Sequence, residues 1–164
     1  MAGDREPDGG WLDPREQRAW LAYIRLQLRL TYEINRQLQA DSDLSLADWD
    51  VLTALGAAPD TTMTITALAA QIGWERSRLS HQVKRMSARG VLSLRQCAAD
   101  RRVTEVVLTE SGRSVLTGAA PGHVELVRRL FFDGLPDELL EPLSTALEKV
   151  YENVLERGSL PGPE

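Results

Sequence analysis

The densest set of chemically active side chains lies between Trp74 and Arg102. This window holds eight basic and two acidic residues, a net charge of +6, although the whole chain carries −5 at pH 7. Basic groups at this density suit a polyanion, because they neutralise phosphates and release counterions. The other residues sum to −11, so a basic patch is expected on an acidic body. The basic residues are Arg76, Arg78, Lys84, Arg85, Arg89, Arg95, Arg101 and Arg102.

A pair of short helices is predicted on either side of Gly73. The first begins at Thr64 or Thr66 and ends at Gly73, where a residue without a Cβ can adopt the left-handed backbone of a tight turn. Two short helices joined in this way are typical of a helix-turn-helix, whose second helix enters the DNA major groove. That second helix carries a narrow apolar stripe at spacings i, i+4 and i+7, formed by Leu79, Val83 and Met86.

The rest of the second helix is polar and basic, as a recognition helix requires. Residues near its N-terminus can reach base edges, and arginine can make a bidentate contact with guanine. The alternative is an ordinary amphipathic surface helix with solvated charges. The expected base readers are Ser77, Arg78 and His81, the expected phosphate contacts are Arg76, Lys84 and Arg85, and Ser80 shares their polar face.

A β-hairpin, or wing, is predicted after this helix. Its strands are VLSLRQ and RRVTEVVL, which are rich in β-branched residues and flank residues 97–100. Arg101 and Arg102 lie at its tip, where an arginine can enter the negative minor groove, and Arg95 lies on the first strand. Asp100 is a poor DNA contact by charge, so we expect it to shape the turn through hydrogen bonds. A plain turn with two solvated arginines is the alternative.

Helices are predicted on both sides of this region. One opens at Asp13-Pro14 and runs to about Ala40, and the next is capped by Ser45, with Asp48 three residues further on. A further helix starts at Thr109, with an irregularity expected near Gly118 and Pro121-Gly122, and the last is expected to start late or bend at Pro142. The fold class is therefore mainly α with a small β wing. The expected domains are a disordered tail at 1–10, a helical dimerisation region at 11–45 and 110–157, a winged helix-turn-helix at 46–109 and a C-terminal tail at 158–164.

The composition excludes several other kinds of protein. No apolar run approaches the roughly 20 residues that span a bilayer, and the polar, acidic N-terminus is not a secretory signal, so no membrane partner and a cytoplasmic location are expected. Cys97 is the only cysteine, which rules out an internal disulfide. With two histidines and no nearby carboxylate cluster, neither a metal nor another cofactor is expected.

Three aromatic side chains and the cysteine suggest regulation. Trp20, Tyr23 and Trp49 are candidates for a small-molecule effector pocket, the alternative being that they are core residues. Oxidation of Cys97 in the wing could displace a DNA contact. His123 is expected to be structural or solvated.

Four segments together resemble the MarR family of winged-helix regulators, and the resemblance covers Pro14 to about Leu155. The most specific part is the step from an Asp-x-Arg wing into LT-x-x-G. The segments are LSLADWDVLTAL, ITALAAQIGWERSRLSHQVKRMSARGVL, the Asp100-Arg101-Arg102 wing with VVLTESG, and HVELVRRLFFDGLP.

This resemblance implies a homodimer whose two helical chain ends intertwine. It also implies binding to pseudo-palindromic double-stranded DNA near promoters, usually as a repressor, with release by a small, often aromatic, effector or by an oxidant. Oxidant-sensing relatives carry their reactive cysteine in the first helix, where this chain has none. The long apolar stripes of the first and last helices support a dimer independently, because they exceed what one winged helix covers.

Two other classes of function are alternatives to a DNA-binding regulator. A winged helix can bind an acidic protein partner instead of DNA through the same basic face. An enzyme is disfavoured, because no glycine-rich phosphate loop, nucleophile elbow or metal-ligand spacing occurs in the sequence.

Overall fold

The computed structural model describes residues 11–163 of the chain, and the expected disordered tail at 1–10 lies outside them. The chain forms two compact units, one up to Glu33 and one from Ile34 onward. The first unit is mainly the N-terminal part of helix α1 (Pro14–Ser42). Asp13 caps this helix as predicted, because its Oδ1 accepts from the backbone N of Arg15 at 2.7 Å and of Glu16 at 2.8 Å.

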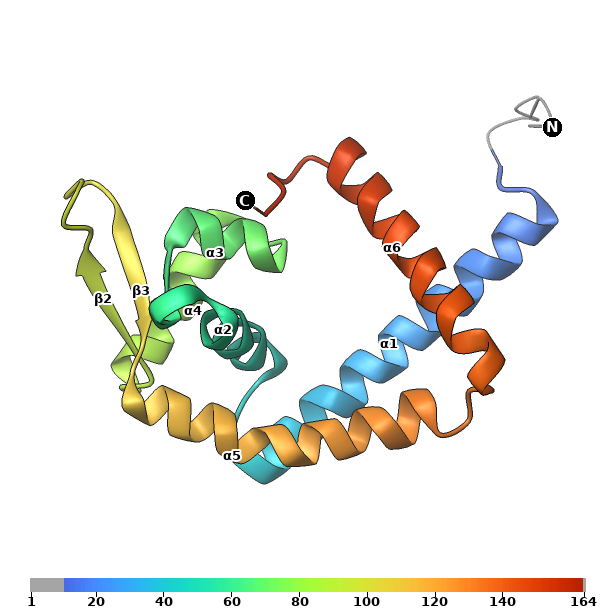
Figure 1. The fold of residues 1–164 in the computed structure, drawn as a ribbon, viewed down its shortest axis with the longest axis horizontal. Coiled ribbons are helices and arrows are strands. Elements are labelled where there is room, and N and C mark those ends of the chain that lie inside the picture. The colour runs from blue at the N-terminus through green and yellow to red at the C-terminus, as the bar shows by residue number, and fades with distance from the viewer. Residues whose placement is uncertain (1–10, 164) are drawn as a thin grey trace. The chain divides into compact units, whose positions relative to one another are not determined.

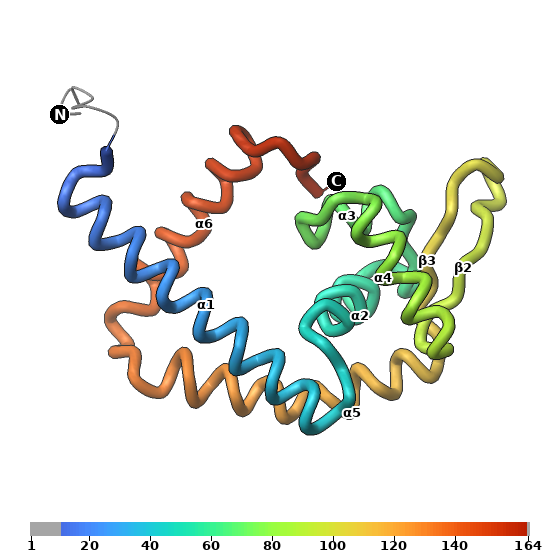
Figure 2. The backbone as a smooth tube through the Cα atoms, turned by 180° about the vertical axis from the view of Figure 1, so that it is seen from behind, coloured from blue at the N-terminus to red at the C-terminus, as the bar shows by residue number. Residues whose placement is uncertain are grey.

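The second unit contains the end of α1 and a winged helix-turn-helix followed by helices (Figure 1), which confirms the predicted fold class. Figure 2 shows from behind how β3 leads directly into α5. In chain order the elements are α2 (Leu46–Ala57), a 3-10 turn (Pro59–Thr61), β1 (Thr62–Thr64), α3 (Ile65–Ile72), α4 (Arg76–Ala88), β2 (Leu92–Gln96), β3 (Thr104–Leu108), α5 (Glu110–Val127), a π-helical turn (Arg128–Phe132), a 3-10 turn (Asp137–Leu139) and α6 (Leu140–Arg157).

The caps predicted for the helix-turn-helix are present. Ser45 and Asp48 form a reciprocal capping box at α2, with the Ser45 Oγ accepting from the Asp48 backbone N at 3.1 Å. Thr64 caps α3 by accepting from the backbone N of Ala67 at 3.1 Å. Gly73 ends α3 with a φ of 69°, the left-handed conformation that the turn requires. Local sequence signals therefore set the boundaries of α2 and α3.

The sheet has three antiparallel strands in the order β1-β3-β2 among the described residues, where the sequence predicted two. The predicted hairpin is β2 with β3, in a register that places Arg95 opposite Glu105. The additional strand, β1, is only three residues long and pairs Met63 with Val106. So short a run has no recognisable alternation, and its strand conformation comes from pairing with β3.

One aliphatic core joins α2, α3, α4 and the sheet. Leu52, Leu68, Leu79 and Val106, one from each of these elements, are fully buried in it. The root of the wing is fixed to this core at Thr109, which accepts from the Gly112 backbone N at 3.0 Å and donates to the Gly90 carbonyl at 2.8 Å. A Cβ at Gly112 would lie 2.1 Å from the Val91 carbonyl oxygen, so this first turn of α5 touches the backbone before β2.

The irregularity predicted near Gly118 and Pro121 is wrong, because α5 continues through both residues to Val127. Pro121 is exposed, so the carbonyl that loses its helical donor there can bond to water. A Cβ on Gly122 would lie only 3.0 Å from Gln37 Nε2 at the end of α1.

The late start predicted for the last helix is confirmed. Helix α6 begins at Leu140, so Pro142 occupies its first turn, where no backbone N–H is needed. No helix within residues 11–163 is long and apolar enough to cross a membrane.

Candidate nucleic-acid interface

Helix α4 separates a buried apolar stripe from an exposed polar face. Leu79, Val83 and Met86 are all fully buried, as the spacing predicted. Ser80 is half-buried and its hydroxyl donates to the Arg76 carbonyl at 2.8 Å. The helix therefore presents one continuous basic surface, formed by the exposed residues Arg76, Ser77, Arg78, His81, Lys84 and Arg85.

The N-terminal end of α4 is held by an aromatic contact. The Arg78 guanidinium carbon lies 3.9 Å from the centroid of the Trp74 ring, which belongs to the turn between α3 and α4. The charge of Arg78 also acts on Asp50 of α2. Burial raises the pKa of the Asp50 carboxyl above its ordinary value, and the Arg78 charge opposes that shift. The first turn of α4 is thus electrostatically linked to α2.

The C-terminal part of α4 is held by a buried polar cluster centred on Asp48, which is 6% exposed. Gln82 Nε2 donates to Asp48 Oδ1 at 2.7 Å, and an Arg89 guanidinium nitrogen lies 3.1 Å from Asp48 Oδ2. Arg85 donates to Gln82 Oε1, so an expected phosphate contact is connected to this cluster. Asp48 also completes the α2 capping box, and through these contacts one carboxylate joins two helices.

Arg95 of the wing is paired with an acid. Its Nε lies 2.7 Å from Glu105 Oε2 on the neighbouring strand, and the Arg95 hydrogen bond holds the pKa of Glu105 below its ordinary value. The Cys97 thiol contributes a smaller effect in the same direction. Cys97 is half-buried beside this ion pair.

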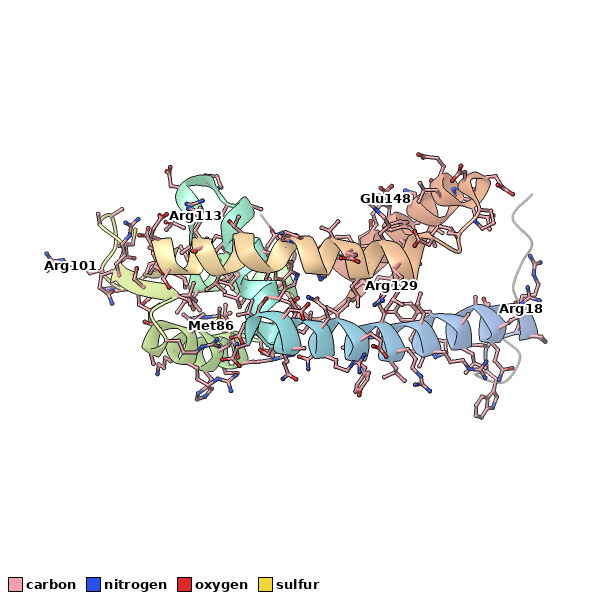
Figure 3. The ribbon with its side chains drawn as sticks, turned by 90° about the horizontal axis from the view of Figure 1, so that it is seen from below. Arg18, Met86, Arg101, Arg113, Arg129 and Glu148 are labelled. Atoms are coloured by element: carbon pink, nitrogen blue, oxygen red, sulfur yellow. The ribbon has the colours of Figure 1, made fainter. Side chains whose placement is uncertain are left out.

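The wing tip carries the other two predicted arginines. Asp100 Oδ1 accepts from the Arg102 backbone N at 2.9 Å, the hydrogen bond that a turn-shaping role requires. The backbone closes the loop through Val103 N donating to the Asp100 carbonyl at 3.0 Å. Arg101 and Arg102 are exposed, and Figure 3 shows Arg101 projecting from the tip of the hairpin.

The aromatic residues predicted to line an effector pocket occupy two environments. In the first unit, Trp20 and Tyr23 are both about half-exposed, with ring centroids 5.6 Å apart. In the second unit, Trp49 is buried in the core with its ring centroid 4.6 Å from that of His123. Burial lowers the pKa of His123 below its ordinary value, so this imidazole is a neutral packing partner of Trp49 near pH 7.

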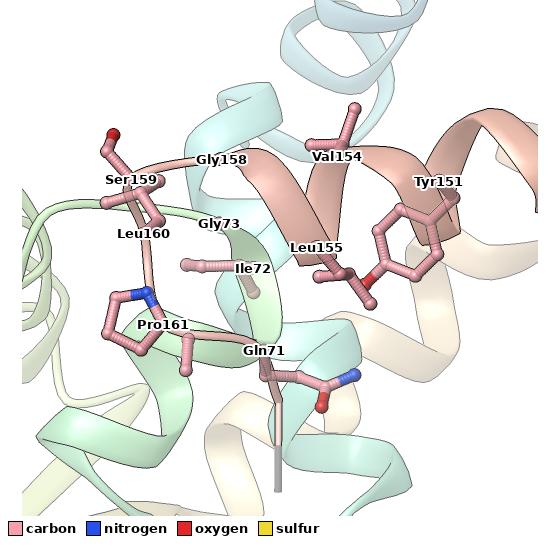
Figure 4. Close-up of a pocket in the computed structure, with 11 residues that line it drawn as sticks. Gln71, Ile72, Gly73, Tyr151, Val154, Leu155, Gly158, Ser159, Leu160 and Pro161 are labelled. Atoms are coloured by element: carbon pink, nitrogen blue, oxygen red, sulfur yellow. The ribbon is translucent and has the colours of Figure 1, made fainter.

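An apolar hollow of about 400 Å³ lies elsewhere in the second unit, between the end of α3 and the end of α6 (Figure 4). Ile72 and Gly73 line one side, and Tyr151, Val154 and Leu155 line the other. It adjoins the turn of the helix-turn-helix. No group of three potential metal ligands occurs within residues 11–163.

Three residues of this surface were not predicted from the sequence in the roles they have. Asp48 was recognised only as part of a cap, and Trp74 was not assigned. Gln82 follows Leu79 by three residues and precedes Met86 by four, so a polar residue lies within the apolar stripe. A polar residue within a buried stripe needs a hydrogen-bond partner, so the position of Gln82 could have indicated one.

Comparison with known proteins identifies the family. The MarR family model matches residues 42–103. Sco3205, a MarR family transcriptional regulator from Streptomyces coelicolor crystallised in complex with DNA, is 34% identical over 94% of this chain and 100% of its own, with a TM-score of 0.86. AbsC, a MarR family transcriptional regulator from the same organism, is 34% identical over 90% of this chain and 99% of its own, with a TM-score of 0.84.

The fold is shared more widely. CouR from Rhodococcus jostii RHA1, whose crystal structure contains p-coumaroyl-CoA, is 19% identical over 85% of this chain and 95% of its own, with a TM-score of 0.72. Sco3205 and AbsC are transcriptional regulators, which agrees with the prediction that the chain is not an enzyme. On the similarity to Sco3205 and AbsC, the chain belongs to the MarR family of transcriptional regulators.

Proposed function

We propose that this chain is a sequence-specific DNA-binding regulator in which α4 reads the major groove and the wing contacts the minor groove. The observation that carries the proposal is the exposed basic face of α4 beside a hairpin with two exposed arginines at its tip. The similarity to Sco3205 in its DNA complex supports the same assignment. The contacts of α4 supply base readout, and Arg102 supplies a sequence-independent contact.

The experiment is a binding titration against DNA from the gene's own upstream region over a range of salt concentrations. Arg102→Ala should weaken binding to every sequence and reduce the salt slope by about 1, because one cationic contact to the DNA is lost. Arg78→Ala should relax base preference by roughly 5- to 150-fold at one position. Arg129→Ala, on the turn after α5, is the matched control and should change neither.

A winged helix that binds an acidic protein instead of DNA predicts different results. In that case wild-type protein would retard no upstream fragment at low salt, and mutations of α4 would affect only the binding of the protein partner. That outcome would reject the DNA-binding proposal.

We further propose that the regulator acts as a homodimer through residues 11–45 and 110–157, while residues 46–109 bind DNA. In the second unit the support comes from α6, where Leu147, Val150 and Val154 are about half-exposed, an apolar surface of a kind that usually marks an interface. Val150→Glu should convert a dimer into monomers in light scattering, whereas Glu148→Gln should not. A two-fold dimer would place its recognition helices about 34 Å apart on a pseudo-palindromic operator.

Repression and release by a small aromatic effector complete the proposal. The hollow between α3 and α6 adjoins the recognition turn, so an apolar molecule bound there would contact Gly73 directly. Such a ligand regulates only if it binds the released conformation more tightly than the DNA-bound one. A reporter placed behind the operator should be silenced by the wild type, and small aromatic compounds that restore expression should lose their effect on Ile72→Trp, which fills the hollow.

A further inference from the structure

Trp74 occupies a fixed position in the turn between α3 and α4. Its backbone N donates to the Ala69 carbonyl at 2.9 Å, directly after Gly73 in its left-handed conformation. The side chain is partly buried and packs against the core of the second unit. The indole is therefore anchored on one side and offers a ring face to its surroundings on the other.

That face is occupied by Arg78, one helical turn further along the chain. The guanidinium carbon lies 3.9 Å from the ring centroid, within the range of a cation–π contact. The five N–H donors of a guanidinium lie in its own plane, so stacking on one face leaves them free to donate at the edge. The contact therefore restricts Arg78 without using the groups that a base would need.

The position of the Arg78 guanidinium also offsets the electrostatic cost of placing a cation near the start of a helix. Arg78 lies in the first turn of α4, where the helix dipole disfavours a cation, and that turn contains no acidic residue. The negative face of the indole and the charge of Asp50 both act in the opposite direction, and the Arg78 charge is felt at Asp50. These two partners favour a guanidinium held beside α2 and α3 over one spread in solvent.

We propose that Trp74 is a positioning residue for Arg78, and that it sharpens the preference of the recognition helix for guanine by holding the guanidinium ready for a bidentate contact. An unrestrained arginine loses rotamer freedom when it binds, and prior restraint reduces that loss. The inference rests on the proposed function, because it assumes that Arg78 meets a base.

The test is a double-mutant cycle on the full-length protein. The probes are a duplex selected by the wild type from a randomised pool and a second duplex in which the guanine read by Arg78 is replaced by adenine. Trp74→Leu should reduce the preference for guanine by roughly two- to fivefold, and Trp74→Phe, which keeps a ring, by less. In an Arg78→Ala background, Trp74→Leu should change the preference no further.

Each other result has a definite meaning. If Trp74→Leu reduces the preference equally in both backgrounds, or weakens binding to both duplexes alike, Trp74 acts through packing and the inference is overturned. Because Trp74→Leu also disturbs the core, the cycle is repeated in an Arg78→Lys background, which keeps the charge but not the planar stack. In that background Trp74→Leu should change the preference for guanine by less than it does in the wild type, and an equal change would overturn the inference. Wild-type protein that binds neither duplex would instead reject the proposed function itself.

Discussion

The two ends of α4 are held in the second unit by different kinds of interaction. At the N-terminal end, the exposed Arg78 side chain stacks on a partly buried indole. In the C-terminal part, Asp48 and Gln82 are 6% and 4% exposed and are joined by a 2.7 Å hydrogen bond. Exposed cation–π contacts contribute about 0.5–1 kcal/mol, whereas hydrogen bonds to charged groups contribute about 1.5–3 kcal/mol. The end expected to read bases is therefore held weakly, and the other end fixes the helix to α2.

Among the variants that test the two ends of α4, Asp48→Ala is expected to have the largest effect on stability. The change removes the capping box of α2 and leaves the buried Gln82 amide without its acceptor, so the free energy of unfolding should fall by about 2–4 kcal/mol. Denaturant titration measures this change. Asp48→Asn, which keeps the shape, should lose less. A loss under about 0.5 kcal/mol in Asp48→Ala would mean that the cluster does not hold α4.

Gln82→Leu tests the same cluster from the side of α4. The leucine fits the apolar stripe, but Asp48 loses its donor and Arg85 its acceptor, so a loss of about 1–3 kcal/mol is expected. Gln96→Leu, at an exposed position of β2, is the control and should stay within about 0.5 kcal/mol of the wild type. Equal stability of the two variants would contradict the role assigned to Gln82.

Two arginine truncations compare the ends directly. Arg89→Ala removes the ion pair with Asp48 and should cost about 1 kcal/mol. The cost is modest because the Arg89 side chain is 42% exposed, so water partly screens the pair. Arg78→Ala should cost about 0.5 kcal/mol in stability, the lower end of the range for an exposed cation–π contact, while changing base preference far more. Calorimetric unfolding and DNA titration of both variants separate the two roles. The reverse order of stabilities would show that the N-terminal contact is the stronger anchor.

The smallest effect is expected from Asp50→Asn, and it depends on pH. Burial raises the pKa of Asp50 in the folded protein, so the folded state resists ionisation. The contribution of the Asp50 carboxyl to the free energy of unfolding is therefore present below its pKa in the unfolded chain, about 3.9. It is lost as the pH rises through its pKa in the folded protein. Asp50→Asn should therefore be more stable than the wild type at pH 7, by less than about 0.5 kcal/mol because Asp50 is partly exposed and its interactions are screened, and match it in acid. If Asp50→Asn became more stable relative to the wild type as the pH was lowered, the pKa of Asp50 would be lowered in the folded protein, not raised.

Features coded within a few residues were predictable from the sequence. The caps at Ser45, Thr64 and Thr109 and the turn at Gly73 each depend on one side chain and its nearest backbone groups. The hairpin and the buried stripe of α4 followed from periodicity in the same way.

Features that depend on a distant partner were not predictable. Strand β1 exists because β3 lies beside it, and Gly122 of α5 lies close to Gln37 at the end of α1, a residue far away in the sequence. Gln82 and Asp48 are 34 residues apart, and no signal in the sequence around either residue predicts that the Gln82 amide will bond to the carboxylate that caps α2. Trp74 and Arg78 are close in the sequence. Helical spacing still does not predict their contact, because Trp74 lies in the turn before the helix and its ring orientation depends on the core.

The absence of a side chain at Gly112 has a mechanical consequence. The first turn of α5 meets the Val91 carbonyl backbone to backbone, with no room for even a methyl group and so no rotamer that could absorb a displacement. Thr109 adds hydrogen bonds to the same stretch through Gly90 and Val91. A rotation of the start of α5 must therefore carry Val91 and the adjoining β2 with it. The root of the hairpin is therefore joined to the first turn of α5 by backbone contact and by the hydrogen bonds of Thr109, with no flexible side chain between them.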